Sequence, residues 1–151
     1  NKKQIIQDKY VVPFSNKVKC NDLSLIEIGI NLREKLDKLY KNIKIDTVII
    51  ENQISPIANR MTTLQGMIAQ YFIMQNITDI EFVAASNKLK SFTNNQKTTY
   101  SERKKLGIDV TKNILTEQNF NEKNDYFNQH KKKDDLADSF LQGLWYIQNI
   151  I

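Results

Sequence analysis

A run of charges that leads into an apolar helical pattern near the C-terminus constrains this chain most. Residues 131–140 read KKKDDLADSF, so three lysines run directly into Asp134 and Asp135, with Asp138 one helical turn further on. The apolar residues that follow are spaced by three or four: Leu136, Phe140, Leu144, Ile147 and Ile151. This spacing predicts an amphipathic helix that begins near Asp134.

The three acids fall on the opening turns of that helix. Asp138 shares a helical face with Asp135, three residues earlier, and with Asp134, four residues earlier. The helix macrodipole favours negative charge at this end, so the simplest interpretation is a capped, solvated helix start with Asp134 as the N-cap. The alternative is a group of carboxylates that binds a cation.

A second acid ends a predicted strand. Residues 46–53 read DTVIIENQ, and the uninterrupted apolar run 48–50 is typical of a strand covered on both faces. Glu51 follows this run directly. In open α/β sheets functional groups collect beyond the carboxyl ends of the strands. Glu51 is therefore a candidate site residue, and the alternative is the first solvated residue of a loop.

Two helices are predicted on either side of this strand. Leucine and isoleucine recur at helical spacing from Leu25 to Leu39, and Ser24 with Glu27 forms a capping-box start. Residues 59–75 show a second stripe that carries Met61 and Met67, which we interpret as core.

Residues 79–85 alternate, with Ile80, Phe82 and Ala84 on one face, and predict another strand. Strand, helix and strand from 46 to 85 form a βαβ unit, which predicts parallel strands and an α/β fold. Residues 1–14 predict a hairpin remnant or an edge strand.

The remaining segments are more polar. Residues 86–100 predict an exposed loop, residues 101–117 a third helix, and residues 119–129 an Asn-rich, acidic segment. The aromatic residues of this last segment are candidates for docking on the core: Phe120, Tyr126 and Phe127. The length of 151 residues predicts one domain, 1–151.

Composition narrows the possible functions. The net charge of +5 fits a polyanionic partner. A single cysteine, Cys20, excludes an internal disulfide and a cysteine-based zinc site, and a single histidine, His130, argues against a Ser-His-Asp triad. No apolar run approaches the ~18 residues of a membrane helix and no signal-peptide pattern opens the chain. We therefore expect an intracellular, non-secreted protein without a membrane span.

Carboxylates at a strand end and on a distant helix suit divalent cations, because Mg²⁺ prefers oxygen ligands. Two such ions about 4 Å apart can activate water and stabilise the leaving 3′ oxygen in phosphodiester cleavage. Cationic side chains near these acids are candidates for DNA phosphates, with solvated surface charge as the alternative for each. They are Lys88, Lys90, Arg103, Lys104, Lys105, Lys131, Lys132 and Lys133.

Three segments together resemble the poxvirus-type Holliday junction resolvases, the RuvC-like branch of the ribonuclease H-like fold found in large DNA viruses. They are VIIENQ at 48–53, SNKLK at 86–90 and KDDLADSF at 133–140. The resemblance covers roughly residues 24–146. The strand end and the helix start are fairly specific as a pair, whereas either alone is weak.

This resemblance implies a single ribonuclease H-like domain, with a mixed central sheet flanked by helices, that cuts four-way or branched DNA with Mg²⁺ or Mn²⁺. It implies that Glu51, Asp135 and Asp138 are catalytic metal ligands and that Asp134, the flanking acid, belongs to the same metal site. Lys88 and Lys90 match basic residues expected to face DNA. No small-molecule cofactor is implied, and the expected location is the site of viral DNA replication, in the host cytoplasm or a virus factory.

The resemblance also implies a homodimer. Its candidate surfaces are the apolar part of the second helix, at Met61 and Met67, and the tail 145–151, with ordinary core as the alternative for both.

One family feature is missing from the sequence. The family has an Asp on its first strand, and LIEIGI at 25–30 imitates that strand with Glu27 in place of the Asp. Helical spacing favours a helix there instead. We therefore expect that the first strand and its acid precede Asn1, that the intact protein is an active nuclease, and that the chain as given binds metal poorly.

Two other functions stay open. Natural loss of the first acid would leave a junction-binding or nucleic-acid-binding protein without cutting activity. A ribonuclease H-like enzyme with another substrate, such as an RNA–DNA hybrid or a transposon end, would use the same carboxylates.

Overall fold

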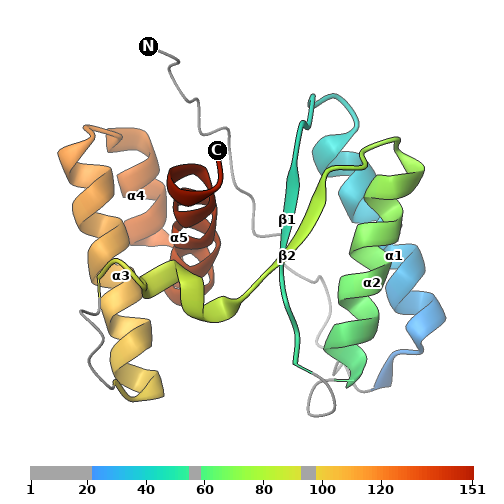
Figure 1. Cartoon of the computed structure of the whole chain (residues 1–151), viewed down its shortest axis with the longest axis horizontal. Coiled ribbons are helices and arrows are strands. Elements are labelled where there is room, and N and C mark those ends of the chain that lie inside the picture. The colour runs from blue at the N-terminus through green and yellow to red at the C-terminus, as the bar shows by residue number, and fades with distance from the viewer. Residues whose placement is uncertain (1–21, 55–58, 93–97) are drawn as a thin grey trace. The chain divides into compact units, whose positions relative to one another are not determined.

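The computed structural model of the chain describes residues 22–54, 59–92 and 98–151 (Figure 1). The described residues fall into two compact units, one up to Phe82 and one from Val83 onward, and each is described by itself. The strand or hairpin predicted for residues 1–14 lies outside these ranges. Of the helices described, none is long and apolar enough to span a bilayer.

The first unit begins with helix α1 (Leu25–Tyr40), as its spacing predicts. The capping box is confirmed: Ser24 Oγ accepts the Glu27 N–H at 3.1 Å, and the Glu27 carboxylate accepts the Ser24 N–H at 2.8 Å. The bond from the Ser24 backbone lowers the pKa of the Glu27 carboxyl. Glu27 is thus a helix cap and does not stand for a first-strand acid.

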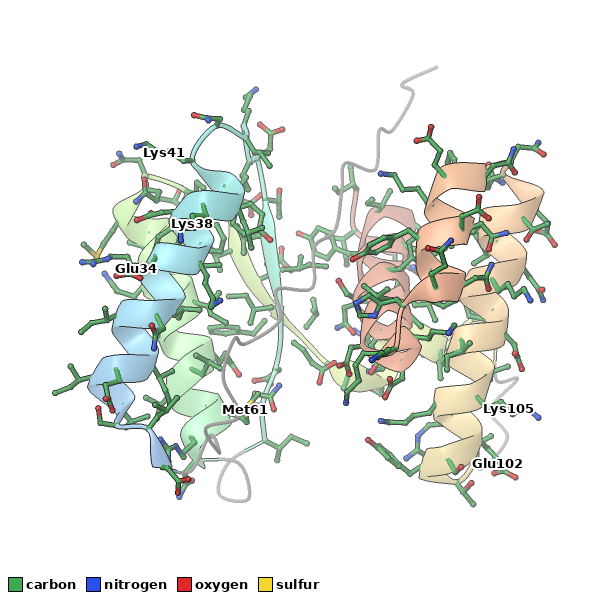
Figure 2. The ribbon with its side chains drawn as sticks, turned by 180° about the vertical axis from the view of Figure 1, so that it is seen from behind. Glu34, Lys38, Lys41, Met61, Glu102 and Lys105 are labelled. Atoms are coloured by element: carbon green, nitrogen blue, oxygen red, sulfur yellow. The ribbon has the colours of Figure 1, made fainter. Side chains whose placement is uncertain are left out.

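Charged side chains cover the outer side of α1. Glu34, Lys38 and Lys41 follow one another along this side at helical spacing, and all three are exposed (Figure 2). The opposite side packs on helix α2. This division is the amphipathic pattern expected of a helix that covers one side of a small core.

The predicted βαβ unit is confirmed. Strand β1 (Val48–Glu51), helix α2 (Asn59–Met74) and strand β2 (Ile80–Val83) follow in order, and the two strands pair in parallel. The Val48 N–H donates to the Asp79 carbonyl at 2.9 Å, which fixes the start of the ladder. Helices α1 and α2 lie together on one side of the strand pair (Figure 1). Within the described ranges the sheet has these two strands.

Two predictions of which residues are buried are wrong. Met61 is 48% exposed, because it lies in the opening turn of α2 and the buried stripe is centred further along. That stripe consists of Gln65, Ala69 and Phe72. On β2 the buried residue is Val83, whereas Phe82 is 51% exposed and Glu81 is exposed too, so burial does not follow the predicted alternation.

The second unit is helical. It consists of the short 3-10 helix η2 (Ala85–Leu89) and three α-helices: α3 (Tyr100–Glu117), α4 (Asn121–Gln129) and α5 (Lys133–Asn149). Figure 1 shows η2 beside α5, and its Leu89 is buried in the core that the three helices share. The loop predicted over residues 86–100 is therefore anchored at its start. Residues 93–97 lie outside the description.

Helix α4 occupies most of the Asn-rich, acidic segment 119–129, for which no helix is predicted from the sequence. Phe127 is 3% exposed and joins the core, as expected of a docking aromatic. Phe120 and Tyr126 are 42% and 43% exposed, so their docking is not borne out.

Helix α5 supplies most of the core of this unit. Its buried residues include Leu136 and Phe140, which the stripe predicts, together with Ala137 and Leu141. Ile151 is exposed beyond the end of the helix, which the prediction misses. The core cluster consists of Leu89, Leu115, Phe127, Leu136, Ala137, Phe140 and Leu141.

Candidate functional site

Glu51 is the last residue of β1, and the backbone that follows it is tied to α2. Glu51 is half-buried. Two residues on, the N–H of Gln53 donates to Gln65 Oε1 at 2.7 Å. The Gln65 amide nitrogen donates to Asn52 Oδ1 at 3.5 Å, and the Gln53 side chain returns to the Glu51 carbonyl at 3.5 Å. The strand therefore ends at Glu51. Beyond it, the backbone is held by the hydrogen bond from the Gln53 N–H to the Gln65 side chain.

The three aspartates stand at the start of α5, as predicted. The helix begins at Lys133, so Asp134 and Asp135 are in its first turn and Asp138 is one turn on. Asp134 is not the N-cap: that position is Lys132, which makes no side-chain capping bond. Asp135 is exposed, and the other two acids are half-buried. The negative charge lies where the helix dipole stabilises it.

Asp138 forms an ion pair with Lys88 of η2. Lys88 Nζ lies 2.7 Å from Asp138 Oδ2, and the two side chains are 15% and 40% exposed. The burial of Leu89 beside it fixes η2 against α5. Lys88, which the family resemblance implies to face DNA, is thus partly withdrawn from solvent and contacts a predicted metal ligand.

Asp134 forms a second ion pair, with Lys104 of α3, at 2.5 Å. The hydrogen bond from Lys104 lowers the pKa of the Asp134 carboxyl, and the same bond raises the pKa of Lys104. Lys104 Nζ also lies 5.1 Å from the centre of the Tyr100 ring, a cation–π distance. This lysine therefore joins the opening turns of α3 and α5.

Two of the other predicted DNA-binding cations form hydrogen bonds to backbone carbonyls. Arg103 donates to the Thr98 carbonyl at 2.5 Å, and Lys133 donates to the His130 carbonyl at 3.0 Å. Both bonds are to backbone and leave the positive charge in place. Figure 2 shows Lys105 near the exposed start of α3. The exposed members of the set are Lys90, Arg103, Lys105, Lys131 and Lys132.

Three side-chain contacts at this candidate site could not be predicted from sequence motifs. Lys88 and Lys104 reach acids 50 and 30 residues away, and no local pattern specifies such pairings. Gln65 carries one usable signal, because it falls on the buried stripe of α2 with Ala69 and Phe72. A buried amide on an apolar stripe requires hydrogen-bond partners, which marks the position as unusual.

The residues present fit a divalent cation by the chemistry of their donors. Carboxylate oxygens are the ligands that Mg²⁺ and Mn²⁺ prefer. Asp134, Asp135 and Asp138 come from one unit and Glu51 from the other. In the residues described, no group of three or more His, Cys, Asp and Glu side chains is gathered closely enough to hold a metal ion.

The chain thus has an α/β unit in which an acid ends a strand, and a helical unit in which three acids and the exposed Lys131 and Lys132 lie at or just before the start of α5. The model of the family described as poxvirus A22 protein matches residues 7–150. The chain therefore belongs to the poxvirus A22 protein family, which is a family of Holliday junction resolvases.

One curated relative is the uncharacterized protein L451 of Acanthamoeba polyphaga mimivirus, which is 33% identical over 147 residues. The match covers 83% of this chain and 35% of the relative, so the chain spans about a third of that protein's length. No solved structure matches the chain significantly.

Proposed function

We propose that this protein is a metal-dependent endonuclease that cuts four-way DNA junctions, and that it does so during viral genome processing. The observation that carries the proposal is the position of Asp135 and Asp138 on the opening turns of α5, in a chain that the family model matches almost throughout. The family supplies the substrate class, and the acids supply the chemistry.

Glu51, Asp135 and Asp138 are the proposed ligands of Mg²⁺ or Mn²⁺, two ions per site, with Asp134 as the flanking acid. The bound ions would activate water and stabilise the leaving 3′ oxygen. This role requires that the end of β1 and the start of α5 meet, as in the ribonuclease H-like fold that we propose for the intact protein. Lys88 and Lys104 hold Asp138 and Asp134 in place through their ion pairs.

The exposed cations are proposed to bind the phosphates of branched DNA. Arg103 and Lys105 at the start of α3, and Lys131 and Lys132 before α5, flank the opening turns that carry the acids. Lys90 follows η2. A homodimer acting at sites of viral DNA replication would cut the two opposed strands symmetrically.

A panel of isosteric variants tests this function. Glu51→Gln, Asp135→Asn and Asp138→Asn remove one charge each and keep the side-chain volume, and the exposed Asp125→Asn on α4 is the matched control. Cleavage of a labelled four-way junction is measured at saturating Mg²⁺, and junction binding in Ca²⁺. We expect each site variant to lose more than the ~100-fold that outer-shell changes cause, with binding nearly unchanged.

Cleavage by Asp138→Asn at the rate of Asp125→Asn would contradict the assignment.

A second function, junction binding without cutting, is favoured by the two ion pairs, since lysines neutralise Asp134 and Asp138. Binding by the unaltered protein without cutting at saturating Mg²⁺ or Mn²⁺ would select it. Preferential cutting of an RNA–DNA hybrid in a competition assay would select the third function, another ribonuclease H-like activity.

A further inference from the structure

We propose that Gln65 is a positioning residue for Glu51: its buried amide holds the backbone after β1 and so fixes the direction of the Glu51 carboxylate. The proposal rests on the nuclease function above. It assigns a role in that function to a helix residue that no motif marks.

The burial of Gln65 needs an explanation. The residue is 8% exposed on a stripe that otherwise carries Ala69 and Phe72, where leucine or methionine would pack without a polar group. Burying an amide without hydrogen-bond partners is unfavourable. Here both ends of the amide have partners, one on Gln53 and one on Asn52. The amide therefore serves these two hydrogen bonds rather than the apolar packing of the stripe.

The stronger bond is the one that acts on the backbone. Gln65 Oε1 accepts from the Gln53 N–H at 2.7 Å, whereas the bond to Asn52 Oδ1, at 3.5 Å, is at the limit of hydrogen bonding. Gln53 lies past the end of β1, where the ladder no longer supplies an acceptor for its N–H. Gln65 supplies that acceptor from the neighbouring helix.

Glu51 consequently lies between two fixed points. Upstream, the Val48 N–H is bonded to Asp79, and downstream the Gln53 N–H is bonded to Gln65. With the backbone fixed on both sides, the Cα–Cβ direction of Glu51 is set. A metal ligand needs this, since Mg²⁺ tolerates little deviation from ideal geometry.

Gln65→Met in the whole protein tests the role, because methionine has a similar length and helix propensity but neither donates nor accepts this bond. Gln70→Met, at an exposed position of the same helix, is the matched control. We expect the Gln53 amide to exchange its hydrogen faster in Gln65→Met, measured by NMR. We also expect the half-saturating Mn²⁺ concentration for cutting to rise and the cutting rate to fall about 10- to 100-fold.

A purely structural role would lower the free energy of unfolding and leave the Mn²⁺ dependence unchanged. Junction affinity in Ca²⁺ should not change in either variant. Cutting by Gln65→Met as fast as by Gln70→Met, while Glu51→Gln is inactive, overturns the inference and leaves the nuclease function standing. An unaltered protein that cuts no junction overturns both.

Should Gln65→Met fail to fold, the unaltered protein still decides the matter. Its Gln53 amide must be protected from hydrogen exchange if the 2.7 Å bond to Gln65 persists in solution. Exchange of that amide at the rate of an unstructured peptide overturns the inference.

Discussion

Asp134 is the acid whose environment is best defined. Lys104 donates to its carboxylate at 2.5 Å, and this bond holds the pKa of Asp134 below the ordinary value of an aspartate. A lowered pKa in the folded state stabilises the protein above the ordinary pKa of the carboxyl. That stabilisation is lost as pH falls through the lower, folded-state pKa.

The resulting prediction concerns acid stability. We expect Asp134→Asn to be less stable than the unaltered protein at pH 6, with the difference shrinking as pH falls below about 3.9, the ordinary aspartate pKa. Urea unfolding followed by circular dichroism at a series of pH values measures it. The exposed Asp125→Asn should show no such convergence, and a pH-independent difference for Asp134→Asn would contradict the ion pair.

For individual residues, the sequence predicts where the acids lie better than it predicts which side chains contact them. The strand end at Glu51 and the helix start with Asp135 and Asp138 follow from local patterns, and the structure has both elements there. The contacts of Lys88 with Asp138 and of Gln65 with Gln53 depend on how separate elements pack. Side-chain periodicity says which face is buried but not which partner lies opposite.

Among the elements, helix glycines offer a controlled test of packing. Gly66 lies in the middle of α2 with nothing within 4 Å of an added Cβ. Gly107 lies in α3, where an added Cβ would meet the Leu141 side chain at 3.8 Å and the Ala137 Cβ at 4.0 Å, both ordinary contacts. A helix-interior glycine costs about 0.5–1 kcal/mol relative to alanine.

We therefore expect Gly66→Ala and Gly107→Ala each to raise the free energy of unfolding by about 0.5–1 kcal/mol. Gly107→Leu should instead destabilise the protein, because it adds bulk to a packed contact with Leu141. Thermal and urea unfolding measure all three. A destabilising Gly107→Ala would mean that α3 and α5 lie closer together than described.

The elements show why periodicity succeeds in some segments and fails in others. Helices α1, α2, α3 and α5 carry long apolar stripes, and all four are predicted. Helix α4 is missed because its nine residues contain a single buried residue, Phe127, which gives no repeat to detect. The buried side of β2 is mispredicted because a strand of four residues, three of them apolar, is too short for alternation to decide which face is buried.

For the whole molecule, the excess of positive charge makes DNA binding depend on salt. Each phosphate contact by a lysine releases condensed counterions and steepens the fall of log K with log salt by about 0.9. Lys131 and Lys132 are exposed just before the acids of α5. They are therefore expected to be among the phosphate contacts of the proposed nuclease.

Lys131→Gln/Lys132→Gln should make the salt slope of junction binding shallower by about 1.8, that is, about 0.9 for each lysine. The control is Lys38→Gln/Lys41→Gln, which removes the same net charge from the outer side of α1 (Figure 2). Fluorescence anisotropy at a series of salt concentrations measures both. Equal slopes for the two double variants would show that residues 131 and 132 do not contact phosphate.

For the whole molecule, the sequence correctly predicts the βαβ arrangement and the family. The ribonuclease H-like fold, the single domain and the homodimer remain predictions. The parallel strand pair follows from the strand, helix, strand order, because a crossover helix favours parallel pairing. The sequence patterns do not determine how the unit that carries Glu51 meets the unit that carries Asp135 and Asp138. The nuclease proposal depends on that meeting.

A crystal structure of the whole protein grown with Mn²⁺, with the metal located by its anomalous scattering, tests this meeting most directly. We predict a metal peak bonded within about 2.2 Å by carboxylate oxygens of both Glu51 and Asp138. A Glu51 carboxylate more than about 10 Å from the opening turn of α5 would contradict the proposal, since paired catalytic ions lie only about 4 Å apart.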